Sequence, residues 1–358
     1  MRTKTLMFLI TYKCNLRCSY CYEPKVTCNR IDKTTLQRLI LSQVESLPEE
    51  YDSFEIHFMG GEPLLEFPLI REISEWLWSQ SFGKALTMIY APTNGTLLSD
   101  EIRVWASTNK DRFCLGLSFD GDNAMQNVNR SQSASSVDLK FFSDTWPRQS
   151  VKMTVSPATI TSLADGVKFL HSNGFTSVVT DLAMGKEIGW EAQHLKTLSN
   201  QLDELSKFYV LERTDCHMSM LDIDIFGLEM PQDNVQKSCS CGEGLSCIDL
   251  NGEEYACHLF SPVALPIDKA KKSQSIEFDN YPMLQSNACQ KCMLNCLCNH
   301  CYGMNYICMG DVTEADPFHC AAFKIMFTAN CRHQLRIAIQ NNDKAALERI
   351  SKFINLIA

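Results

Sequence analysis

The sequence predicts an α/β fold in which a partial (β/α)6 TIM-like barrel precedes a small cysteine-rich iron-sulfur domain and a C-terminal helix. Over the first 190 residues, short apolar segments alternate with amphipathic ones, as expected for parallel strands joined by helices. Each apolar segment ends in polar or glycine-bearing residues, so a site is expected at the C-terminal edge of the strands. After residue 238 the composition changes, and 12 of the 18 cysteines lie between residues 238 and 331.

Six strands and four longer helices account for the first half of the chain. The expected strands are Leu6–Ile10, Phe54–Met59, Leu86–Tyr90, Phe113–Phe119, Val151–Val155 and Ser177–Leu182. The expected helices are Lys33–Ser46, Leu69–Trp78, Leu163–Leu170 and Gly189–Phe208. Six units rather than eight predict an incomplete barrel, open on one side, which a large substrate can enter laterally. A Rossmann fold is disfavoured because the first turn carries cysteines where that fold needs glycines.

Changes in composition divide the chain into four parts. The expected parts are a barrel at 1–190, a connector at 191–237, the cysteine-rich domain at 238–331 and a C-terminal helix at 332–358. The cysteine-rich part has few long apolar runs, so we expect it to need metal to fold. In the last part, Leu335, Ile339, Leu347 and Ile350 share one side of a predicted amphipathic helix. We expect that side to dock on the core.

Charge and hydropathy exclude two classes of partner. The chain has 33 basic and 42 acidic residues, a net charge of -9, and no basic stripe, which argues against nucleic acid. It has no signal peptide, and no apolar run approaches the roughly 20 residues that cross a membrane. A cytoplasmic location is therefore expected. In that reducing compartment, clustered cysteines bind metal more often than they form disulfides.

A three-cysteine loop directly follows the first strand. Cys14, Cys18 and Cys21 have the spacing C-x3-C-x2-C, which can hold three irons of a four-iron four-sulfur cluster and leave the fourth iron open. A zinc site or a redox thiol pair is the alternative, but zinc sites favour two C-x2-C knuckles. The spacing, with Tyr20 before the third cysteine, resembles the signature of the radical S-adenosylmethionine (SAM) superfamily. That resemblance implies that SAM binds the open iron through its amino and carboxylate groups.

A second motif follows the next strand. Gly60 and Gly61 let the backbone approach a ligand closely, Pro63 fixes the turn, and Glu62 supplies an acceptor for an ammonium group. In isolation this is a common sort of turn. Placed one strand after the cysteine loop, it resembles the GGEP element that contacts the SAM amino group in the same superfamily.

The remaining SAM contacts are expected from the later strands. Ser118 and Asp120 leave the fourth strand with groups suited to ribose hydroxyls, and Arg130 is suited to a carboxylate. Ser156, at the end of the fifth strand, is a further ribose candidate. This stretch resembles the ribose- and carboxylate-binding segment of the superfamily, although each residue alone is also typical of ordinary turns and N-caps.

The cysteine-rich part resembles the SPASM domain, an auxiliary-cluster module of radical SAM enzymes that modify peptides and proteins. The resemblance rests on Cys241, Gly252 and Cys257 at one end and on C-x2-C-x5-C at the other. It implies a first auxiliary cluster on Cys241, Cys247, Cys257 and Cys301. It implies a second auxiliary cluster on Cys289, Cys292, Cys298 and Cys320. Structural zinc knuckles are the alternative for the whole segment.

The match to the SPASM pattern is incomplete at one position. The pattern asks for a cysteine four residues after Cys298, where Tyr302 stands, and Cys301 comes one position early. Cys239 and Cys296 are rival ligands. The surplus cysteines are expected to be small buried residues, and they are Cys28, Cys114, Cys216, Cys308 and Cys331.

By length and layout the chain resembles the anaerobic sulfatase-maturating enzymes, which convert a cysteine or serine to formylglycine. Those enzymes use an aspartate directly after the cysteine that corresponds to Cys257, and here that position is His258. His258 can accept a proton in its place or simply pack beside a cluster. Peptide maturases often carry a leader-binding domain before the cysteine loop. Only 13 residues precede Cys14, so we expect a separate protein to hold any leader, unless the connector or the cysteine-rich part does.

We therefore expect a radical SAM peptide maturase that forms an intramolecular thioether or carbon-carbon crosslink through a 5′-deoxyadenosyl radical. The expected cofactors are SAM and three four-iron four-sulfur clusters. The expected partners are a precursor peptide or protein and an electron donor such as flavodoxin or ferredoxin. Formylglycine formation and peptide epimerisation are the alternative reactions. A non-catalytic iron-sulfur or zinc scaffold is the alternative outside enzymes, but a scaffold has no use for a nucleotide site.

Overall fold

The chain forms two compact units, each assembled from several segments. The computed structural model describes residues 2–23, 29–185, 187–212, 215–229, 237 and 239–357. The first unit consists of Met1–Ser118, Ser135–Trp146 and Cys239–Leu284. The second unit consists of Phe119–Ala134, Pro147–Ser238 and Gln285–Ala358. The division into four domains stays a prediction.

A six-stranded sheet with the order β4-β3-β2-β1-β8-β9 forms the centre of the first unit. Its strands are β1 (Thr3–Thr11), β2 (Ser53–Gly60), β3 (Ala85–Thr93), β4 (Phe113–Leu117), β8 (Leu245–Ile248) and β9 (Glu254–Tyr255). Neighbouring strands are parallel except for β8 and β9. β8 comes from the cysteine-rich part and pairs with β1, so that Cys247 lies opposite Met7. This extension of the sheet was not predicted from the sequence.

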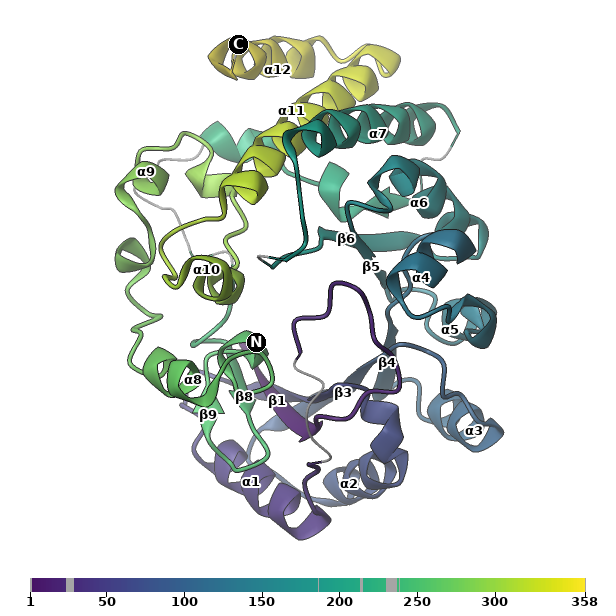
Figure 1. Cartoon of the computed structure of the whole chain (residues 1–358), viewed down its shortest axis with the longest axis vertical. Helices are drawn as coiled ribbons and strands as arrows, with labels where there is room; N and C mark the ends of the chain where they lie inside the picture. Colours follow the sequence, from purple (N-terminus) through teal and green to yellow (C-terminus); the bar gives the residue numbers. More distant parts are fainter. Residues whose placement is uncertain are drawn as a thin grey trace. The chain divides into compact units, whose positions relative to one another are not determined.

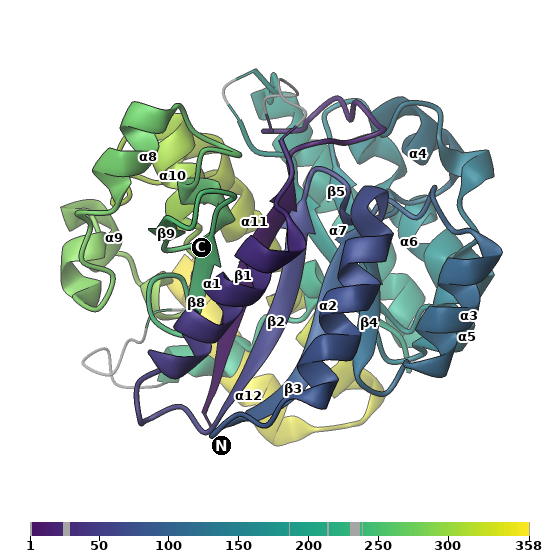
Figure 2. The same cartoon turned by 90° about the horizontal axis from the view of Figure 1, so that it is seen from below.

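Amphipathic helices cover this sheet. The helices of the first unit are α1 (Lys33–Glu45), α2 (Phe67–Ser79), α3 (Asp100–Thr108), α5 (Leu139–Thr145) and α8 (Ile267–Ser273). α1 and α2 lie on the same face of β1–β4 (Figures 1 and 2). Phe8, Phe54 and Phe58 are fully buried in the core of this unit. The Asp32 side chain caps α1 by accepting the Thr35 N–H at 3.0 Å, which satisfies one of the free donors at the helix start.

The second unit contains a three-stranded parallel sheet with the order β5-β6-β7. Its strands are β5 (Val151–Val155), β6 (Ser177–Leu182) and β7 (His217–Met218). Its helices are α4 (Asn123–Asn129), α6 (Leu163–Ser172), α7 (Ala192–Leu211), α9 (Asn287–Gln290), α10 (Tyr302–Met309), α11 (Pro317–Gln340) and α12 (Lys344–Ile357). The six predicted strands and the α/β fold class are confirmed. In the part of the chain that the structure describes, no helix has the length and apolar character needed to cross a membrane.

The C-terminal tail is helical, as expected, but it consists of parts of two helices rather than one. α11 begins at Pro317, inside the cysteine-rich part, and ends at Gln340, and α12 begins at Lys344. Asp316 caps α11, and Pro317 occupies its first turn, where a missing N–H costs nothing. Between the helices Asn342 has φ +57°, a left-handed conformation that ends the first helix. The expected docking on the core holds for Ile350, which is buried in the cluster around Phe327.

An ion pair between Asp203 and Arg336 joins α7 to α11, which pack against each other in the second unit (Figure 1). The pKa of Asp203 is lowered by its hydrogen bond with Lys207 and by Arg336, and these effects outweigh burial, which raises it. Because the folded-state pKa lies below the unfolded value of about 3.9, the stabilisation is complete above pH 4 and is lost as pH falls through the folded-state pKa.

We expect Asp203→Asn to lower the free energy of unfolding at pH 7 by up to about 1 kcal/mol. The difference from the unmodified protein should shrink as the pH is lowered below about 4. Urea unfolding across this pH range measures it. Asp144→Asn, which breaks the exposed pair of Asp144 with Lys140, is the matched control and should change little. A difference for Asp203→Asn that grew toward acid pH would contradict the assignment.

Candidate functional site

The cysteine loop leaves the C-terminal end of β1 and presents three thiols. Cys14, Cys18 and Cys21 are all partly buried. The Leu16 N–H points at the Cys14 Sγ at 3.4 Å, and the Cys21 N–H donates to the Cys18 carbonyl at 3.2 Å. Burial, with smaller contributions from Glu62 and Cys18, raises the pKa of the Cys14 thiol to about 11. Three accessible sulfurs on one short loop fit the donor set of an iron-sulfur cluster with an open iron.

β2 ends at Gly60, and Gly60 and Gly61 lie against the backbone where β1 ends and this loop begins. A Cβ on Gly60 would lie 2.4 Å from the Thr11 carbonyl oxygen, and one on Gly61 would lie 2.5 Å from that of Lys13. The Gly61 N–H donates to the Thr11 carbonyl at 3.2 Å, and the Glu62 N–H donates to the Lys13 carbonyl at 2.8 Å. In the structure the two glycines therefore let β2 approach the cysteine loop, whereas the sequence suggested an approach to a ligand.

Gly61→Ala should destabilise the protein by about 1–3 kcal/mol, because the new methyl group collides with backbone that cannot move alone. The iron content after reconstitution should fall as well, since the collision involves Cys14 as well as Lys13. Urea unfolding and iron analysis check both results. Gly83→Ala is the matched control, because its Cβ meets no heavy atom within 4 Å. Equal effects of the two variants would show that contact with the loop is not the cause.

The Glu62 carboxylate connects three segments of the first unit. It is 1% exposed. It accepts hydrogen bonds from the Leu64 N–H at 3.0 Å, the Thr93 Oγ1 at 2.9 Å and the Asn94 N–H at 2.8 Å. The Asn94 side chain in turn donates to the Asn15 Oδ1 at 2.9 Å, inside the cysteine loop. Glu62 thus holds the ends of β2 and β3 together beside the loop.

Thr93 and Asn94 are site residues for which the sequence suggested no role. Their bonds to Glu62 span about thirty positions of the chain, and no local pattern reports such a distance. Pro63 and Tyr20 lie in the same unit as the cysteine loop, Pro63 buried and Tyr20 partly buried. Ser118 follows β4, partly buried, and its N–H donates to the Thr93 carbonyl at 2.9 Å.

The second unit brings together the other expected SAM-binding residues. Arg130 Nε lies 3.1 Å from the Asp120 Oδ1, and Asp120 is fully buried. Asp120 also accepts the Thr154 N–H at 2.9 Å and the Asn129 Nδ2 at 3.2 Å. Ser156 Oγ donates to the Asn129 Oδ1 at 2.8 Å. Asn129 therefore links Asp120 to Ser156, a role that the sequence did not suggest.

Three of the four cysteines expected to hold the first auxiliary cluster belong to the first unit. Cys241, Cys247 and Cys257 are all buried. Burial first, and then the charge of Cys257, raise the pKa of the Cys247 thiol. Cys301 lies in the second unit and lines a cavity there. The rival Cys239 is partly buried.

His258 follows Cys257 in the first unit. Burial lowers the pKa of its imidazole to about 4, so the ring is neutral at pH 7. Its Nδ1 is buried and has no hydrogen-bond partner among the described residues. The ring centroid lies 5.9 Å from that of Tyr22, which follows the last cysteine of the loop. A neutral ring with a free nitrogen can accept a proton, but a conjugate acid of such low pKa makes it a weak base.

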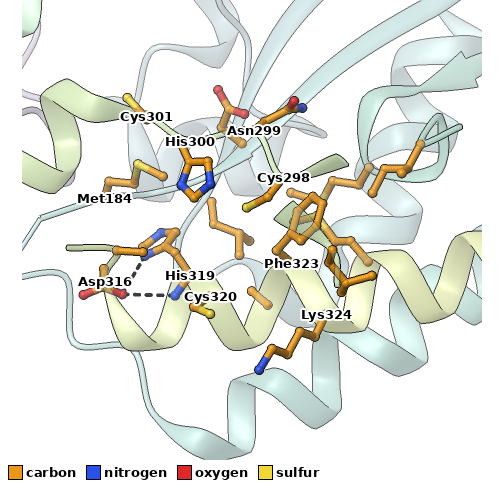
Figure 3. Close-up of a pocket in the computed structure, with 18 of the residues that line it drawn as sticks. Met184, Cys298, Asn299, His300, Cys301, Asp316, His319, Cys320, Phe323 and Lys324 are labelled. Carbon is orange, nitrogen blue, oxygen red and sulfur yellow. Dashed lines mark hydrogen bonds and ion pairs between the residues drawn. The ribbon is translucent and has the colours of Figure 1, made fainter. Parts of the chain in front are cut away.

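All four cysteines expected to hold the second auxiliary cluster line one cavity of ≈ 650 Å³ in the second unit, and Figure 3 shows two of them, Cys298 and Cys320. The four cysteines are Cys289, Cys292, Cys298 and Cys320. Burial first, and then the charges of the other three, raise the pKa of the Cys298 thiol to about 12. The four thiols therefore share one cavity. In the described ranges, no three His, Cys, Asp or Glu side chains form a group that could hold a single metal ion.

The surplus cysteines lie mostly where the sequence placed them. Buried thiols are confirmed for Cys114, Cys216, Cys308 and Cys331. Cys28 lies outside the described residues. The rival ligand Cys296 has its Sγ 4.0 Å from both the Gly227 and the Met293 carbonyl oxygens, at the limit for a weak hydrogen bond of sulfur.

Comparison with known proteins identifies the family. The model of the radical SAM superfamily matches residues 8–191. The serine-type anaerobic sulfatase-maturating enzyme of Klebsiella aerogenes is 32% identical over 141 residues, which are 35% of this chain and 31% of that enzyme. The chain thus matches about a third of that relative's length.

Two solved structures share the fold. Native anSMEcpe with bound AdoMet and Cp18Cys peptide has a TM-score of 0.70 at 18% identity, over 96% of this chain and 100% of that one. Streptococcus suis SuiB bound to the precursor peptide SuiA has a TM-score of 0.56 at 15% identity, over 84% and 72%. These likenesses show the fold alone, whereas the family model covers more than half of the sequence. The chain therefore belongs to the radical SAM superfamily, a family of enzymes that use S-adenosylmethionine and a four-iron four-sulfur cluster.

Proposed function

We propose that the chain modifies a ribosomally made peptide by forming an intramolecular crosslink, either a thioether or a carbon-carbon bond. A peptide substrate is supported by the two structures of similar fold that hold a peptide, anSMEcpe and SuiB. One observation carries the choice of crosslinking over formylglycine formation. His258, with its buried Nδ1, stands after Cys257, where the sulfatase-maturating enzymes have an aspartate to act as base.

The residues of the first unit position the cofactors. Cys14, Cys18 and Cys21 bind the cluster. Glu62 holds the ends of β2 and β3 together beside the cysteine loop, through its hydrogen bonds with Thr93 and Asn94. The backbone around Gly60–Pro63 and Glu62 receives the SAM amino group, with Tyr20 beside the loop. When bound, the cofactors supply a 5′-deoxyadenosyl radical that abstracts a hydrogen atom from the peptide.

The residues after β4 and β5 bind the remaining parts of SAM. Arg130 binds the SAM carboxylate, and its pairing with Asp120 fixes the guanidinium plane for a bidentate contact. Ser118 and Ser156 bind the ribose hydroxyls, and Asn129 holds the Ser156 hydroxyl in place. Asp120 completes this group by orienting Arg130.

Two auxiliary clusters complete the proposal, giving about twelve irons per chain at four for each cluster. Cys241, Cys247, Cys257 and Cys301 are the proposed ligands of one, and the other occupies the cavity of the second unit. When bound, they would take up the electron that the peptide radical loses, together with a proton, as the crosslink forms, while flavodoxin or ferredoxin would supply the separate electron that cleaves SAM. Iron and sulfide analysis after anaerobic reconstitution tests this number. A total near four irons, or zinc in place of iron, would overturn the three-cluster proposal.

Formylglycine formation is the second candidate, because the Klebsiella aerogenes relative is a sulfatase-maturating enzyme. Mass spectrometry separates the candidates when the reconstituted enzyme acts on a cysteine-bearing sulfatase peptide and on peptides encoded beside the gene. A crosslink appears as the loss of two hydrogens, and formylglycine as an aldehyde that reacts with a hydrazine probe. An unchanged mass with an inverted residue would mean epimerisation. Either of the last two results would overturn crosslinking.

A further inference from the structure

The cavity of the second unit offers more donors than one cluster needs. A four-iron cube takes one protein ligand per iron. Cys289, Cys292, Cys298 and Cys320 already supply four sulfurs. The imidazole of His319 lines the same cavity, as does the Asp316 carboxylate beside it (Figure 3). The four cysteine sulfurs and the His319 imidazole make five candidate ligands for four irons, so one of the five does not bind iron.

The hydrogen bonds of His319 determine which of its nitrogens is available. Asp316 Oδ1 accepts two hydrogen bonds from His319, one from the backbone N–H at 3.0 Å and one from Nδ1 at 2.9 Å. The carboxylate therefore holds the proton on Nδ1 and leaves the lone pair on Nε2. That Nε2 is buried and has no hydrogen-bond partner in the described part of the chain. A carboxylate on one ring nitrogen and a free lone pair on the other is the arrangement of metal-binding histidines.

The neighbouring donors differ from His319 in this respect. The Nε2 of His300, which also lines the cavity, lies 3.3 Å from the Asn295 Oδ1. Cys320 is exposed, whereas Cys289, Cys292 and Cys298 are partly buried. Cys320 nevertheless contributes the largest nearby charge to the pKa of Cys298, so it is the competing donor for the fourth iron.

We propose that His319 Nε2, rather than the Cys320 thiolate, is the protein ligand of the fourth iron in the second auxiliary cluster. This inference rests on the proposed cluster in that cavity. With an imidazole nitrogen in place of a thiolate, the cluster carries one negative charge less than an all-cysteine cluster, which raises its reduction potential as histidine ligands do in Rieske centres.

Nitrogen hyperfine spectroscopy tests the ligand directly. The full chain is labelled with 15N-histidine, reconstituted with iron and sulfide, reduced, and measured by electron-nuclear double resonance. A strong coupling to histidine nitrogen is expected in the unmodified protein, in Cys320→Ala and in the matched control His300→Gln. It should be lost in His319→Gln, which should also lose iron from its normal complement of about twelve. If His319→Gln does not fold, the presence or absence of histidine-nitrogen coupling in the unmodified protein still decides between the two ligands.

The outcomes separate this inference from the proposed function. About twelve irons without histidine coupling would make Cys320 the ligand, overturning the inference but leaving the three clusters intact. Coupling that persists in His319→Gln would overturn the inference as well. A total near eight irons, unchanged by His319→Gln, would mean that the cavity holds no cluster, and both proposals would fail at this site.

Discussion

Alanine at Cys14, Cys18 and Cys21 together is expected to reduce the formation of 5′-deoxyadenosine from SAM to background. The three thiols lie on one loop of the first unit, and all three cysteines are partly buried. Without them no protein sulfur of this loop remains to bind iron, so the open iron that receives SAM is lost with the cluster. Liquid chromatography with mass spectrometry measures 5′-deoxyadenosine in reactions with SAM and a chemical reductant, and this readout needs no peptide substrate.

A matched variant separates loss of the cluster from loss of any thiol. Cys114→Ala removes a buried thiol from the same unit, on β4. It should keep both its iron and its 5′-deoxyadenosine production, whereas the triple variant should lose about four irons per chain. If the triple variant still produced 5′-deoxyadenosine at the rate of Cys114→Ala, the cysteine loop would not be the site of SAM cleavage.

Local sequence patterns predicted the parts of the fold that depend on neighbours in the chain. The six strands were found because apolar runs and the polar residues that end them are local features. β8 was missed because it is only four residues long, and its pairing with β1 is a contact between distant segments. The start of α11 was also missed, although Asp316-Pro317 is an N-cap followed by a proline in the first turn.

The same distinction applies to the candidate site. The spacing of Cys14, Cys18 and Cys21 encodes the donor set directly, because the three thiols share one loop. The role of Glu62 could not be predicted in full, since its partners Thr93 and Asn94 come from the end of another strand. Likewise, the sequence assigned Asp120 to ribose hydroxyls, whereas the structure buries both of its oxygens against donors of the protein.

Arg130→Met is expected to lower the free energy of unfolding by about 3–5 kcal/mol, because it leaves the fully buried Asp120 carboxylate without its cation. Arg71→Met is the matched control. The Arg71 side chain is 44% exposed and pairs with Glu75 one turn along the same helix, so its loss should cost much less than the loss of Arg130. Urea unfolding of both variants measures the contrast, and equal losses would contradict the buried pair.

A double variant then separates charge from packing. In Asp120→Asn/Arg130→Met both charges of this buried pair are removed, so part of the stability lost in Arg130→Met should return. This matters for function, because Arg130 is also the proposed ligand of the SAM carboxylate. If the double variant regains stability but still binds SAM weakly, the weak binding cannot be attributed to unfolding. Recovery of both stability and SAM affinity would instead mean that Arg130 serves only to neutralise Asp120.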